Sequence, residues 1–169
     1  MERTKALLLS GLFMTAVSCS AGAEKYDLIG EFPVPDGASD VKRLVLGASA
    51  AQQLFFQIRE PYPSTRVLGV YRDFLRAHGW IQCADANKDW ASHEDRSSKP
   101  YLLVHEISEH WAKRDDRKLL ILSTKYYSKN LSNDRPDSDE QRVIVWVQRV
   151  ADLERELSEL GVDCGSESK

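Results

Sequence analysis

Residues 101–127 read YLLVHEISEHWAKRDDRKLLILSTKYY, and this stretch decides the fold class. Two segments rich in apolar and β-branched residues, 101–111 and 119–127, flank the charged hexapeptide KRDDRK at 113–118. A polar break between two strand-like runs is a strong signal for an antiparallel hairpin. Strands that follow one another in this way argue against a doubly wound parallel sheet.

Further strands are expected on both sides of this hairpin. The segment QRVIVWVQRV at 141–150 is apolar in both registers, which suits a central strand covered on two faces. Segments 41–46 and 54–59 are β-rich and predict a second hairpin. Residues 80–84 predict a short strand, and a polar loop is expected from there to about Pro100.

Two helices are expected, one in each half of the chain. The clearer one lies at 65–78, where apolar residues recur every three or four positions. The hydroxyl of Ser64 or Thr65 is placed to cap it, and Gly79 is placed to end it. The second helix, at 151–160, carries one apolar side made of Leu153, Leu157 and Leu160.

Together these segments predict an α+β fold, a twisted antiparallel sheet of about five strands with two helices packed on one face. The predicted organisation is a signal peptide at 1–23, an irregular lead-in at 24–40, a single α+β domain at 41–164 and a polar tail at 165–169. The helix-free face should be partly exposed although its strands are apolar. We therefore expect the lead-in, a long loop, a second copy of the chain or a partner to cover it.

The first residues have the order of a secretory signal peptide. Basic Arg3 and Lys5 precede the apolar run at 6–17, and small residues follow. The run is too short for a permanent membrane helix, which needs about 20 residues. Ala21-Gly22-Ala23 is an A-x-A site and predicts a released chain that begins at Glu24. The leader therefore predicts export.

A second cut competes with this one. Ala16-Val17-Ser18-Cys19 resembles the lipobox of bacterial lipoproteins, although Ala16 stands where that motif usually has leucine. The resemblance implies a lipid on Cys19 and, because Ser20 follows, transport to the outer membrane. Both outcomes stay open: a released periplasmic protein, or one anchored to the outer membrane. The stretch VLGVYRDFLRAHGW at 67–80 also resembles helix-then-Gly-Trp stretches of small exported bacterial proteins, and it implies no activity.

The cysteines bear on the compartment. Either cut removes or acylates Cys19, which leaves Cys83 and Cys164. Exported compartments are oxidising, so we expect these two residues to form a disulfide, with two separate buried thiols as the alternative. Neither cysteine has a C-x-x-C neighbour, so the sequence does not indicate a redox motif or a thiolate zinc site.

Charge and motif spacing argue against several functions. The net charge of −3 disfavours nucleic-acid binding. In HEISEH at 105–110 the histidines are five residues apart, whereas the zinc motif H-E-x-x-H needs them four apart on one helical face. No G-x-S-x-G nucleophile turn is present. We therefore expect no metal, no cofactor and no catalytic site. The enzyme alternative is a hydrolase with a site assembled from scattered residues such as His93 and Glu106.

These observations favour a non-enzymatic accessory protein of the bacterial envelope, periplasmic or lipid-tethered, that acts by binding. Its partner would be another envelope protein, and its contact with the membrane would run only through a lipid on Cys19. The alternative is a periplasmic inhibitor or immunity-type protein that neutralises a specific toxin or enzyme. If Trp111, Tyr126 and Trp146 share the helix-free face, they would form an aromatic patch suited to a protein or glycan.

Overall fold

The computed structural model describes residues 27–47, 51–85, 91–95, 102–128, 136 and 138–165. The predicted leader, with Cys19, lies outside these residues. In chain order the elements are β1 (Ser39–Leu46), β2 (Ala51–Arg59), α2 (Arg66–Ala77), β3 (Ile81–Gln82), β4 (Ala84–Asp85), β5 (Ala91–Asp95), β6 (Leu102–Lys113), β7 (Lys118–Ser128), β8 (Glu140–Arg149), α3 (Leu153–Leu160) and β9 (Val162–Asp163).

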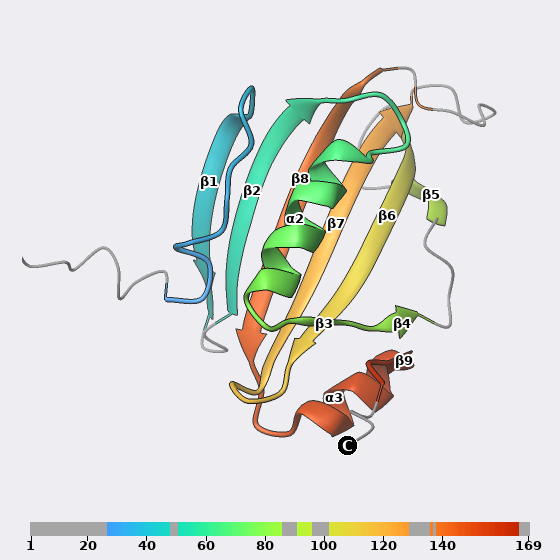
Figure 1. Cartoon of the computed structure of the whole chain (residues 1–169). Helices are drawn as coiled ribbons and strands as arrows, with labels where there is room; N and C mark the ends of the chain where they lie inside the picture. The colour runs from blue at the N-terminus through green and yellow to red at the C-terminus, as the bar shows by residue number, and fades with distance from the viewer. Residues whose placement is uncertain are drawn as a thin grey trace, which may run out of the picture.

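The main sheet is antiparallel and runs in the order β1-β2-β8-β7-β6-β3, with β5 also paired to β6 (Figure 1). The predicted α+β class is therefore confirmed, and its five long strands are those expected from the sequence. Two short strands, β3 and β5, bring the sheet to seven strands rather than about five. Strand β5 occupies part of the predicted polar loop, because pairing with β6 overrides the weak strand propensity of ASHED.

The β6–β7 hairpin is the longest pairing in the sheet. Its register runs from Leu103 opposite Ser128 to Lys113 opposite Lys118. Arg117 closes the turn with a φ of 49°. Strand β8 pairs with β7 on one side and β2 on the other, so the central position predicted for it is confirmed.

Helix α2 lies across one face of the sheet (Figure 1). It is held there by one apolar stripe, Val67, Leu68, Tyr71 and Leu75. Gly79, with a φ of 76°, follows its last turn as predicted. An ion pair fixes its orientation, because Arg72 binds Glu109 of β6, whose side chain is only 3% exposed.

The predicted cap of α2 is wrong. Thr65 occupies the N-cap position but makes no side-chain cap bond. Instead the Glu60 carboxylate accepts from the backbone N–H groups of Thr65 at 2.9 Å, Val67 at 3.1 Å and Arg66. Ser64 donates its hydroxyl to the same carboxylate at 3.2 Å. A carboxylate satisfies several free amides at once and also complements the positive end of the helix dipole, which one hydroxyl cannot do.

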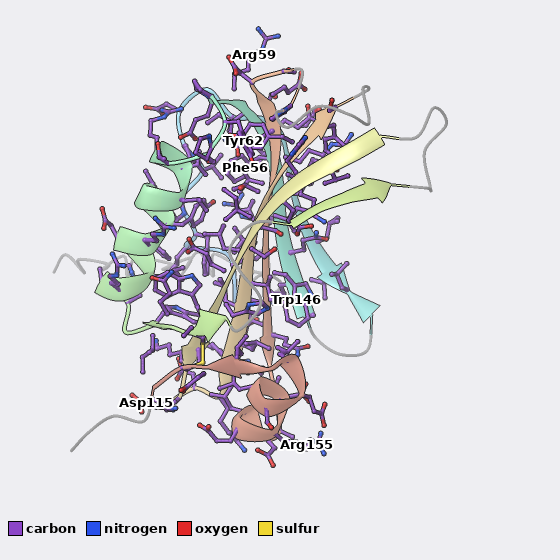
Figure 2. All side chains as sticks on the ribbon, turned by 90° about the vertical axis from the view of Figure 1, so that its right-hand side faces the viewer. Phe56, Arg59, Tyr62, Asp115, Trp146 and Arg155 are labelled. Carbon is purple, nitrogen blue, oxygen red and sulfur yellow. A yellow bond between two sulfur atoms is a disulfide. The ribbon has the colours of Figure 1, made fainter. Side chains whose placement is uncertain are left out.

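Helix α3 packs on the opposite side of the sheet from α2, so the prediction of two helices on one face is wrong. Its Leu153 and Leu157 cluster with Ala112 and Leu119. Those two strand residues alternate with Trp111 and Leu120, which lie under α2. The chain reaches this side because β8 ends at the β6–β7 turn, from which α3 folds back (Figure 2).

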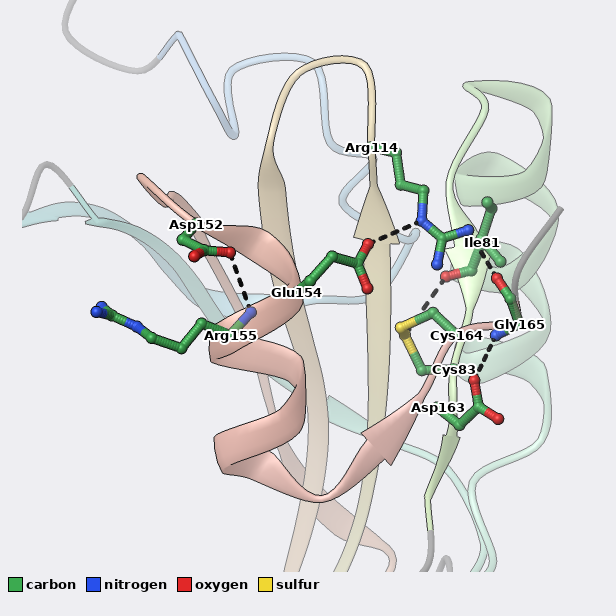
Figure 3. Close-up of polar contacts among 9 residues, drawn as sticks. All are labelled: Ile81, Cys83, Arg114, Asp152, Glu154, Arg155, Asp163, Cys164 and Gly165. Atoms are coloured by element: carbon green, nitrogen blue, oxygen red, sulfur yellow. Dashed lines mark hydrogen bonds and ion pairs between the residues drawn. A yellow bond between two sulfur atoms is a disulfide. The ribbon is translucent and has the colours of Figure 1, made fainter.

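A disulfide between Cys83 and Cys164 holds α3 in place, and the predicted pairing is confirmed. The bridge joins the segment after β3 to the segment after α3, 81 residues apart in sequence. Arg114 reinforces this junction by contacting Glu154 at 3.2 Å and the Gly165 carbonyl at 2.6 Å (Figure 3). Asp152 caps α3 by accepting from the Arg155 N–H at 3.1 Å. Within the described residues, no helix has the length and apolar character that a membrane crossing requires.

Candidate binding face

The two faces of the sheet differ in how they are sealed. We call the side under α2 the covered face and the other side the open face. One row of the open face runs across five strands through Leu44, Gln53, Trp146, Ile121 and His110. Its interior members are half-buried and Leu44 is 43% exposed.

The neighbouring row adds apolar area to the open face. It runs from Lys42 through Phe55 and Ile144 to Ser123 of β7 and Ser108 of β6. Phe55 and Ile144 are half-buried although they lie on interior strands. Helix α3 covers only the end of this face, where Trp146 packs beside its leucines. The middle of the sheet therefore presents apolar side chains that no described element covers.

A polar cluster lies beside this apolar area. The Glu106 carboxylate accepts from Ser108 at 2.9 Å and from Ser123, and it pairs with Lys125 at 3.2 Å. The two serine oxygens are 2.7 Å apart. Burial alone would raise the pKa of Glu106, but the serine hydrogen bonds and the Lys125 charge outweigh it and lower that pKa. Glu106 is therefore held ionised and is poorly suited to act as a general base at neutral pH.

Two cations flank the apolar area without an acidic partner. The Arg142 guanidinium lies over the Tyr127 ring at 4.6 Å, and the Lys42 ammonium lies over the Phe55 ring at 5.7 Å. Neither cation makes an ion pair within the part of the chain that the structure describes. Both are exposed. The rim of the open face is thus locally basic on a chain whose net charge is −3.

The predicted aromatic patch is wrong, because its three members do not share a face. Trp111 and Tyr126 point to the covered face and are fully buried. Trp111 donates its indole N–H to Glu109 at 3.2 Å, and Tyr126 donates to the Glu60 carbonyl at 3.0 Å. Burial raises the pKa of Tyr126. Only Trp146 lies on the open face (Figure 2).

The histidines do not converge on a metal. His105 is buried on the covered face, where its ring meets that of Tyr62 edge-on, whereas His110 lies on the open face. No group of three or more metal-ligating side chains occurs among the described residues. His93 lies on β5 opposite Val104 rather than in a loop, and its side chain is outside the described part.

A surface pocket of about 370 Å³ lies between the start of β1 and the end of β2. Arg59 and Arg66 line it together with Asp36 and Glu140. Charges of both signs share this small volume, so the pocket favours no single class of charged ligand. It holds no serine, cysteine or histidine arrangement of the kind that nucleophilic catalysis needs.

Two structural groups were missed by the sequence interpretation, and the chain carries a signal for only one of them. Glu109 falls between Ile107 and Trp111 in a period of two, which marks it as a residue of the buried face. Its partner Arg72 lies outside the apolar stripe of α2, so the helical period does not mark it. Glu60 has no such signal, because its role as the cap of α2 depends on the bend at Pro61 and Pro63 that brings it back to the helix.

The open face therefore combines an apolar centre, a fixed polar cluster and two cations that have no acidic partner among the described residues. Such a surface can bind another protein by burying its apolar centre and pairing its basic rim. No protein-family model matches the chain, and no curated protein sequence matches it either.

Proposed function

We propose that this chain is an exported, non-enzymatic accessory protein of the bacterial envelope and that it acts by binding another envelope protein through the open face of its sheet. The observation that carries the proposal is the incomplete burial of Phe55, Ile121 and Ile144 on interior strands, beside covered-face neighbours that are fully buried. Contiguous apolar area of this kind, rimmed by polar groups, marks an interaction surface.

The charges on the open face specify the partner's chemistry. Lys42 and Arg142 flank the apolar centre and have no acidic partner in the described part of the chain, while Glu106 is already satisfied by Lys125 and two serines. A complementary surface would carry an apolar centre and carboxylates at its rim. The partner is therefore a protein with an acidic rim around an apolar patch, rather than a nucleic acid.

Export is part of the same proposal. The leader has the order of a signal peptide, and the Cys83–Cys164 disulfide supports an oxidising compartment, where such bonds form and persist. Mass spectrometry of the processed chain tests this directly. A mass that matches a chain beginning at Glu24 indicates release, and a mass that matches a chain beginning at an acylated Cys19 indicates a lipid anchor. An intact Met1 with two free thiols would overturn export.

The binding proposal is tested by photo-crosslinking in living cells of the source organism. A benzophenone amino acid replaces Ile144 on the open face, and in a separate strain it replaces Val70, which is 39% exposed on α2. We expect one envelope protein to be cross-linked from position 144 and not from position 70. The purified partner should then bind the wild-type chain and lose at least tenfold in affinity for Ile144→Glu.

The control for that affinity measurement is Val70→Glu, which places the same charge on an exposed apolar site on α2, away from the open face. It should bind as the wild type does. Equal cross-linking from positions 144 and 70, or equal binding by Ile144→Glu and Val70→Glu, would contradict the proposal. A partner that is an enzyme or toxin and is inhibited on binding would instead assign the chain to the inhibitor class.

A further inference from the structure

The exposed apolar residues of this chain are concentrated on one edge strand. Of the five large apolar side chains that are exposed in the described residues, three lie on β1: Val41 at 41%, Leu44 at 43% and Val45 at 42%. Leu44 stands opposite Gln53 and so faces the open side, whereas Val45 stands opposite Gln52 and faces the covered side. A strand with apolar residues on both faces is typical of the interior of a sheet, not of its edge.

The two edges of the sheet are built differently. At the far edge, β6 is flanked by β3 and β5, which are two and five residues long. Short edge strands of this kind protect a sheet from pairing with other chains. At the near edge, β1 is eight residues long and pairs only with β2 among the described elements (Figure 1). Among the described residues, no strand pairs with the outer side of β1 from Lys42 to Val45.

Charged side chains usually protect such an edge, and β1 carries Lys42 and Arg43. Here each cation lies against a group of its own chain, although the Lys42 side chain stays exposed. The Lys42 ammonium lies over the Phe55 ring, and Arg43 donates to the Phe32 carbonyl at 3.4 Å. The one irregularity of the β1–β2 pairing lies between Ser39 and Lys42, which leaves Lys42 to Leu46 in regular register.

We propose that β1 pairs antiparallel with β1 of a second copy, so that two sheets join edge to edge about a two-fold axis at Leu44. This register places Leu44 opposite itself, Lys42 opposite Leu46 of the second copy, and Arg43 opposite Val45 of the second copy. No like charges face each other. A two-fold axis at Lys42 or Arg43 would oppose two identical cations, which destabilises a strand pair. Two-fold pairing is also the commonest form of self-association.

The pairing joins the two open faces side by side, because Leu44 belongs to the open-face row that contains Trp146. One strand pair is a small contact by the standards of stable interfaces. The dimer should therefore dissociate on dilution. Binding of the envelope partner rests on the proposed function and on the middle of the open face, and of its contacts only Lys42 lies on this edge strand.

Sedimentation equilibrium over about 1 to 500 µM tests the proposal, with the protein produced from the full chain and purified in its processed form. We expect a concentration-dependent dimer for the wild type. Leu44→Lys should raise the dissociation constant by roughly tenfold or more, because two ammonium groups then face each other at the axis. An equimolar mixture of Leu44→Lys and Leu44→Glu should restore the dimer, since only residue 44 faces its own copy.

The matched control is Val70→Lys, which should dimerise as the wild type does. If Leu44→Lys shows no cooperative unfolding, Leu44→Thr is tested in its place, because threonine favours strands and removes the apolar contact at the axis. A wild type that stays monomeric at about 500 µM overturns the proposal. So does a Leu44 variant that dimerises unchanged, or a mixture that fails to recover the dimer. Loss of partner binding with an intact dimer would affect the proposed function alone.

Discussion

The covered and open faces are made by the same strands and by neighbouring residues, yet they differ in how deeply their side chains are buried. On β7, Leu120 points under α2 and is fully buried, whereas Ile121 points to the open side and is half-buried. On β8, Val145 and Ile144 repeat the contrast. Polar groups on the covered face also have a structural role, because Arg72 and Trp111 bind the Glu109 carboxylate. On the open face, Lys42 and Arg142 contact aromatic rings and make no ion pair with a described residue.

This difference teaches that apolar composition does not identify a core. Both residues of each neighbouring pair are aliphatic, so only the register and the position of α2 decide which one is sealed. Apolar residues that no described element covers contribute less to stability than buried ones. The proposed function assigns them to contact with another molecule.

The largest expected effect comes from truncating neighbouring residues on the two faces. Leu120→Ala should lower the free energy of unfolding by about 3 kcal/mol, because it leaves a cavity under α2. Ile121→Ala should lower it by only about 1 kcal/mol, since part of its side chain is already in water and no described helix packs over it. Urea unfolding of both variants, with the disulfide oxidised, measures the difference. Equal losses would mean that the open face is as well sealed as the covered one.

The next effect concerns the disulfide that pins α3 over the end of the open face. Replacing Cys83 and Cys164 together by serine should destabilise the chain by roughly 3 kcal/mol, because the bridge closes a long loop in the unfolded chain. Loosening α3 should also expose Trp146, which packs beside it, while Trp111 stays buried. Urea unfolding and iodide quenching of tryptophan fluorescence measure these two results. An unchanged quenching constant would show that α3 does not depend on the bridge.

A smaller effect is expected from the ion pair that fixes α2 on the covered face. Arg72→Gln leaves the Glu109 carboxylate buried without its cation and should cost about 2 kcal/mol of unfolding free energy. Arg76→Gln is the control, since Arg76 is 59% exposed and its Asp73 contact is 3.9 Å long. That variant should change stability by less than about 1 kcal/mol. Similar losses of unfolding free energy in the two variants would show that the Arg72–Glu109 pair does not hold α2 on the sheet.

The smallest effect concerns Glu106 on the open face. Its pKa is lowered from 4.5 in the folded chain, so its stabilising contribution is present above pH 4.5 and is lost as the pH falls through the folded value. The difference in unfolding free energy between wild type and Glu106→Gln should therefore be larger at pH 6.5 than at pH 3, by less than about 1 kcal/mol. Ser123→Ala should shrink this pH dependence. A difference that is constant across the range would contradict the lowered pKa.

Most of the fold could be predicted from local signals, because they agree with one another. The charged turn after Lys113, the alternation in β6 and β7, and the glycine after each helix locate the main elements to within a few residues. The side of the sheet taken by α3 could not be predicted, because its apolar stripe fits either face. The aromatic patch failed for a related reason: Trp111 and Trp146 lie on different strands, and only the register shows that they face opposite ways.

The proposed function depends on the open face being open in the isolated chain and closed by a partner in the cell. Cysteine labelling at two neighbouring positions of β8 tests this most directly, with Ile144→Cys on the open face and Val145→Cys on the covered face. In the purified protein, position 144 should react with a maleimide at close to the rate of a free thiol, and position 145 should be protected. In cells of the source organism, position 144 should become protected as well. Protection of position 144 in the purified chain, or unchanged labelling in cells, would contradict the account.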